Sequence, residues 1–165
     1  MKRNSTLFLK AVILLLAIVV LIIMIRFPQT EGRAANLDLI SIYKDPLIIY
    51  MYIASIPFFV ALYQTFKLLN LVDKNEQNSS TSKIFSQATV KAVRNIKYCA
   101  IALIGFLAGA IFYIRVATQG DDPTGPTTIG LIAIFTSLVI ATATAVFQKV
   151  LQNAVDIKSE NDLTV

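Results

Sequence analysis

Residues 11–25 have the sequence AVILLLAIVVLIIMI, an apolar run without a single polar side chain. With its flanks the apolar segment covers 7–25, and Lys10 is its only charged residue. We expect the aliphatic part of the Lys10 side chain to carry the ammonium to the lipid headgroups. At ~1.5 Å per residue the segment extends about 28 Å, close to the ~30 Å hydrocarbon core of a bilayer. It exceeds the ~7–15-residue apolar region of a signal peptide, and Arg26 follows in place of a small-residue cleavage site. This stretch therefore predicts a membrane-spanning helix that remains as an anchor.

Three further apolar segments follow, at residues 47–66, 98–114 and 128–147. The first of them begins behind Pro46, a residue that suits the first turn of a helix. Pro57 lies at its middle and removes one backbone donor, so we expect a kink there, as a static bend in preference to a hinge. The sequence thus predicts an all-α integral membrane protein, a single domain with four transmembrane helices.

The composition agrees with a membrane protein and narrows its chemistry. Of 165 residues, 56% are hydrophobic and 15% are charged, against about 25% charged in soluble domains. The chain has 0 histidines and 1 cysteine, which excludes histidine triads, histidine-bound haem and zinc sites built on several thiolates. We expect a non-enzymatic protein with no catalytic residue, no cofactor and no metal.

Lysines and arginines predict the orientation, because cytoplasmic loops carry the excess of them. Of the 15, eleven lie in the N-terminal region, in the connection 66–98 and in the tail 148–165. The other four lie in the two loops on the opposite side: Arg26, Arg33, Lys44 and Arg115. We therefore expect a multi-pass protein of the bacterial cytoplasmic membrane with both termini in the cytoplasm.

Small residues recur at helical spacing in the third and fourth segments. Gly105 and Gly109 share one helical face, and the fourth segment carries a stripe at every fourth position: Ala133, Ser137, Ala141 and Ala145. Small faces let helix backbones approach closely. We expect these two helices to pack against each other within one chain, with the seam of a homodimer as the alternative.

The connection between the second and third segments predicts a cytoplasmic amphipathic helix over residues 84–97. Lys91, Arg94 and Lys97 recur at every third position, opposite apolar side chains. Such a helix suits an anionic leaflet, where each basic side chain contributes ~1 kcal/mol of attraction. We favour contact of these three residues with the lipid headgroups of the inner leaflet over a docking face for a cytoplasmic partner.

The interiors of the segments 47–66, 98–114 and 128–147 contain no Asp, Glu, Lys or Arg. Pumps and charge-coupled transporters need such groups at membrane depth. A small oligomeric permease for an apolar solute stays open as an alternative. Basic residues on the inner side account for the net charge of +5, so we expect no direct binding of nucleic acid.

Two stretches are distinctive: VKAVRNIKYCA at residues 90–100, which leads into the third apolar segment, and the ending DIKSENDLTV at 156–165. They resemble the bacterial membrane family called domain of unknown function 2975. The resemblance implies a four-helix membrane protein, often encoded beside a small helix-turn-helix repressor, with no established catalytic residue. We therefore expect a membrane sensor that engages a helix-turn-helix transcriptional regulator. Immunity or stress protection against membrane-active peptides is the alternative.

Overall fold

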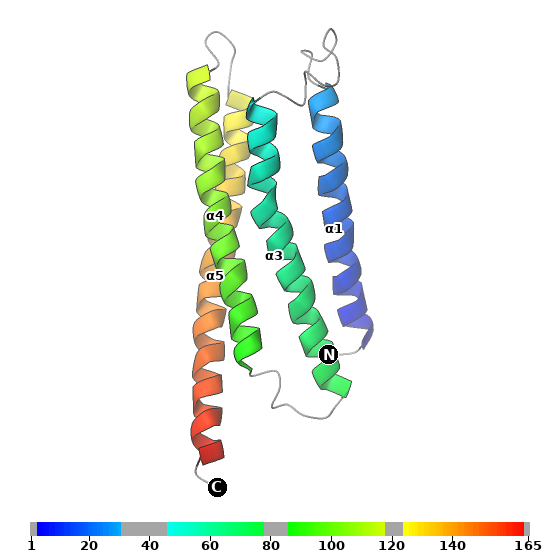
Figure 1. Cartoon of the computed structure of the whole chain (residues 1–165), viewed down its shortest axis with the longest axis vertical. Helices are drawn as coiled ribbons and strands as arrows, with labels where there is room; N and C mark the ends of the chain where they lie inside the picture. The colour runs from blue at the N-terminus through cyan, green and yellow to red at the C-terminus, as the bar shows by residue number, and fades with distance from the viewer. Residues whose placement is uncertain (1–2, 31–45, 78–85, 118–123, 164–165) are drawn as a thin grey trace.

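The computed structural model describes residues 3–30, 46–77, 86–117 and 124–163. These residues form α1 (Arg3–Thr30), α3 (Pro46–Gln77), α4 (Gln87–Ala117) and α5 (Thr124–Leu163). The helices run alternately up and down, so both chain ends lie at the same end of the bundle (Figure 1). We call this the terminal end and the other the opposite end.

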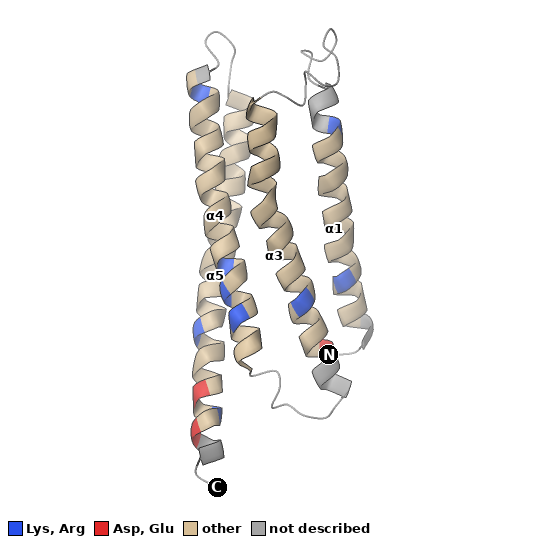
Figure 2. Ribbon diagram, in the orientation of Figure 1, with Lys and Arg blue, Asp and Glu red and all other residues tan. Residues whose placement is uncertain are grey.

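Each of the four helices is long and apolar enough to cross a membrane. Their charged residues lie toward the two ends of the bundle, and a broad band without charge separates the two groups (Figure 2). Most large apolar side chains in this band are exposed in the isolated chain, as a protein solvated by lipid requires. The predicted all-helical fold, with four helices long and apolar enough to span a membrane, is confirmed for the described residues.

The helices do not pack equally. α4 makes its most extensive contact with α5, α3 packs on α4, and α1 packs mainly on α3 by a thinner contact. The buried apolar side chains concentrate in the first half of α4, at Val90, Ala92, Val93, Ile96 and Ala100, with Ala141 of α5. The best-packed part of the described chain is therefore near the terminal end, between α4 and its neighbours.

The stretch predicted as a separate amphipathic helix is instead the beginning of α4. Ser86 precedes the helix, its carbonyl accepts from the backbone N–H of Val90 at 3.2 Å, and α4 then runs unbroken from Gln87 into the third span. Val90 and Val93 are buried within the protein. Because the apolar side finds partners inside the bundle, this stretch does not turn to lie along a leaflet. Residues 84 and 85 of the prediction lie outside the described part.

Pro57 lies inside α3, which continues through it from Pro46 to Gln77. The ring removes the backbone N–H that would bond to the carbonyl of Ile53. Membrane helices accommodate such a residue because neighbouring helices support the backbone around it. The helix thus continues through Pro57, with one hydrogen bond fewer at its middle.

Candidate functional site

Basic residues gather at the terminal end of the bundle (Figure 2). Every helix contributes to this group, which among the described side chains comprises Lys10, Lys67, Lys91, Arg94, Lys97, Lys149 and Lys158. Only Arg26 and Arg115 are described at the opposite end. The candidate functional surface is therefore the terminal end, where charge, exposed helix surface and the chain ends come together.

Lys10 forms an ion pair between α1 and α3. Its Nζ donates to Oδ2 of Asp73 at 2.8 Å, and the two side chains are 16% and 27% exposed. The sequence suggested a lysine that reaches the headgroups alone. The partner was missed because it lies 63 residues away and no local spacing rule connects the two positions. The pair joins the N-terminal helix to the rest of the bundle.

The three basic residues predicted to contact a lipid surface or a partner separate into two kinds. Lys91 and Arg94 are exposed on α4. Lys97 instead donates from Nζ to Oε1 of Gln148 on α5 at 2.7 Å, and its ammonium lies 5.1 Å from the centroid of the Tyr98 ring. Lys91 and Arg94 thus face outward, whereas Lys97 helps to hold α4 against α5.

Gly109 accommodates α3, not α5. Tyr50 of α3 donates its hydroxyl to the carbonyl of Phe106 at 2.8 Å, and the two rings meet edge to face with centroids 5.9 Å apart. A Cβ on Gly109 would lie 2.5 Å from the Tyr50 hydroxyl oxygen, whereas a Cβ on Gly105 would meet nothing within 4 Å. The two glycines therefore differ in role, although their spacing suggested one common face.

The small-residue stripe of the fourth span lies along the packed side of α5. Ser137 and Ala141 are buried, and Ala133 and Ala145 are half-buried. The close approach between α4 and α5 also involves Gly130, where an added Cβ would lie 2.9 Å from Ile111. Gly130 lies three residues before Ala133, outside the four-residue repeat of the stripe, which would continue at Ile129.

The polar groups within the spans are largely satisfied by their own helices. The hydroxyls of Thr65, Thr136 and Thr142 each donate to the carbonyl four residues earlier, at 2.9 Å. Among the described residues no group of three or more His, Cys, Asp or Glu could hold a metal ion. The described spans thus display helix packing and exposed apolar side chains, and the charged groups lie toward the ends of the bundle.

Comparison with known proteins identifies relatives of the whole chain. Residues 29–165 match the family described as "Protein of unknown function (DUF2975)". The "Uncharacterized membrane protein YoaS" of Bacillus subtilis (strain 168) is 44% identical over 167 residues, covering 100% of each chain. No solved structure matches. The family match covers α3 to α5, and the Bacillus relative extends the similarity through α1.

Proposed function

Because the chain belongs to the membrane-protein family DUF2975, we propose that it is a non-enzymatic membrane sensor whose terminal end engages a cytoplasmic helix-turn-helix regulator. In this proposal both termini lie in the cytoplasm, and the protein resides in the bacterial cytoplasmic membrane. The signal is the state of the envelope or of its lipids. The family resemblance implies the regulator, and the end of α5 is the surface that would receive it.

The orientation is supported by the distribution of charge. Basic side chains of all four helices collect at the terminal end, whereas the opposite end has Arg26 and Arg115 among the described side chains. Cytoplasmic flanks of membrane helices carry such an excess. Lys91 and Arg94, exposed on the first turns of α4, would contact the anionic headgroups of the inner leaflet in this orientation.

The observation that carries the regulator proposal is the length and surface of α5. Its 40 residues extend about 60 Å, twice the ~30 Å hydrocarbon core, and its last turns pass beyond the start of α4 (Figure 1). Val150, just after the contact of Gln148 with α4, and Ile157, nearer the end of α5, are 59% and 60% exposed, and their spacing places them on one face of the helix. Exposed apolar side chains in a helix that leaves the membrane indicate a protein-binding surface.

Charged groups beside this apolar face would give the contact its selectivity. Lys149 is exposed next to Val150, and Asp156, which accepts from Gln152 at 2.9 Å, is exposed next to Ile157. A partner helix with a few apolar residues and charges of both signs would fit such a face. The uncharged band of the spans, in contrast, offers nothing for charge-coupled transport.

The test is site-specific crosslinking in living cells. A photoreactive amino acid at position 157 should capture a cytoplasmic helix-turn-helix protein, whereas the same amino acid at position 139, exposed at mid-span, should capture none. The double variant Val150→Glu, Ile157→Glu should lose the crosslinked partner and change expression of the genes that the partner controls. Normal membrane levels of the variant with unchanged expression of those genes would refute the proposal.

A further inference from the structure

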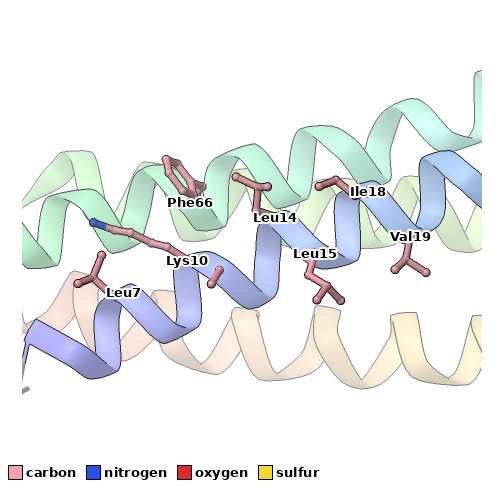
Figure 3. Close-up of a pocket in the computed structure, with 8 residues that line it drawn as sticks. Leu7, Lys10, Leu14, Leu15, Ile18, Val19 and Phe66 are labelled. Atoms are coloured by element: carbon pink, nitrogen blue, oxygen red, sulfur yellow. The ribbon is translucent and has the colours of Figure 1, made fainter.

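An open apolar groove of about 680 Å³ runs along α1 near the terminal end. One residue of α3, Phe66, and one face of α1 line it, and the α1 residues are Leu7, Lys10, Ala11, Leu14, Leu15, Ile18 and Val19. Figure 3 shows Leu14 and Ile18 directed toward α3, Leu15 and Val19 directed away from it, and the Lys10 side chain extended toward α3. The groove exists because α1 packs mainly on α3 and leaves its remaining surface uncovered.

The length of the groove selects the kind of occupant. From Leu7 to Val19 the α1 helix rises about 18 Å, close to half of the ~30 Å hydrocarbon core. A transmembrane helix from a second chain would seek contact along the full thickness of the bilayer. A groove one leaflet long, with almost entirely apolar walls, instead matches the acyl chain of a lipid.

The charges at the end of the groove select the headgroup. The Lys10 ammonium lies there and has three N–H donors, of which its bond to Asp73 uses one. Lys67 is exposed and directly follows Phe66 in α3, so the local balance of Lys10, Asp73 and Lys67 is positive. A basic site at the inner end of a cleft between membrane helices is suited to an anionic headgroup.

We propose that this groove binds one anionic phospholipid, with an acyl chain along the α1 face and its phosphate between Lys10 and Lys67. The lipid would complete the contact of α1 with the bundle, which the protein alone leaves thin. This inference is independent of the helix-turn-helix partner, since it concerns α1 and α3 and not the end of α5.

The experiment measures lipid retention by native mass spectrometry. The full-length protein in detergent micelles receives equal amounts of phosphatidylglycerol and phosphatidylcholine, and the bound lipids are counted for each chain. The wild type should retain one phosphatidylglycerol with a preference of about fivefold, the effect of one basic residue near the headgroup. Equal retention of the two lipids would overturn the proposal, because it would indicate unspecific boundary lipid.

Two matched pairs of variants locate the site. Ala11→Trp fills the groove and should abolish retention, whereas Leu16→Trp, on an exposed part of α1 outside the groove, should preserve it. Lys67→Gln should make the retention of phosphatidylglycerol and phosphatidylcholine nearly equal, whereas Lys149→Gln on α5 should leave the preference for phosphatidylglycerol unchanged. The proposal fails if Ala11→Trp retains phosphatidylglycerol as Leu16→Trp does, if Lys67→Gln keeps the full preference, or if Ala11→Trp instead dissociates a dimer.

Discussion

At the residue scale, a single hydroxyl explains why Gly109 has no side chain. The hydroxyl oxygen of Tyr50 lies where a Cβ would have to be, and it is held there by its bond to the Phe106 carbonyl. We predict that Gly109→Ala destabilises the protein by about 1–3 kcal/mol, the usual cost of added volume in a packed interface. The free energy of unfolding in mixed micelles, measured by titration with dodecyl sulfate, gives this value.

Gly105→Ala is the control, since the same methyl group meets open space at that position. It should be neutral or stabilise α4 by about 0.5–1 kcal/mol, because alanine favours the helix over glycine. Adding Tyr50→Phe to Gly109→Ala removes the obstructing oxygen and should recover much of the loss. Equal effects of the two alanine variants would show that Tyr50 does not occupy the space beside Gly109.

The pair of Lys10 and Asp73 supports a second prediction at this scale. Lys10→Gln leaves a partly buried carboxylate without its partner, and we predict a loss of about 1–3 kcal/mol, between the values for exposed and buried pairs. The exchanged variant Lys10→Asp, Asp73→Lys should recover stability relative to either single change. Unfolding in mixed micelles measures all of them. A double variant no more stable than the singles would mean that the pair does not hold α1.

At the element scale, the contact of α4 with α5 depends on small side chains along α5. Ala141 is 8% exposed on the packed side, whereas Ala143, two residues later, is exposed. We predict that Ala141→Leu destabilises the protein by about 1–3 kcal/mol and that Ala143→Leu changes its stability little. Both variants replace alanine by leucine in the same helix, so the change in helix propensity is the same. The difference between their free energies of unfolding therefore measures the effect of packing. Similar effects at both positions would indicate that position 143 also faces a protein surface.

The four helices could be predicted from the sequence, but the contacts between them could be predicted only in part. Apolar runs about as long as the bilayer is thick place the four spans, since a buried backbone must bond within its own helix. The sequence alone could not show that residues 87–97 continue into α4. Its apolar side, with Val90 and Val93, fits a leaflet or a neighbouring helix equally well, and only the tertiary contact distinguishes the two.

The exposure of the basic residues on α4 was likewise predicted only in part. Charge placed Lys91 and Arg94 on an exposed face, and the structure agrees. Lys97 has the same spacing, yet its ammonium bonds to Gln148, 51 residues away. Likewise the groove along α1 follows from how α1 sits on α3, which no periodicity within α1 encodes.

At the scale of the whole molecule, four membrane-spanning helices would place both chain ends on one side, and from the basic residues we predict that this side is the cytoplasm (Figures 1 and 2). We predict that a fluorescent protein that matures only in the cytoplasm is bright when fused after Val165, and that alkaline phosphatase fused there is inactive. Alkaline phosphatase inserted after residue 120, between α4 and α5, should be active because that connection would face the outside. The reverse pattern would place the basic residues of the terminal end outside the cell. A cytoplasmic regulator could then not bind at Ile157, and a lipid of the inner leaflet could not lie beside Lys10. Both proposals therefore require a cytoplasmic terminal end.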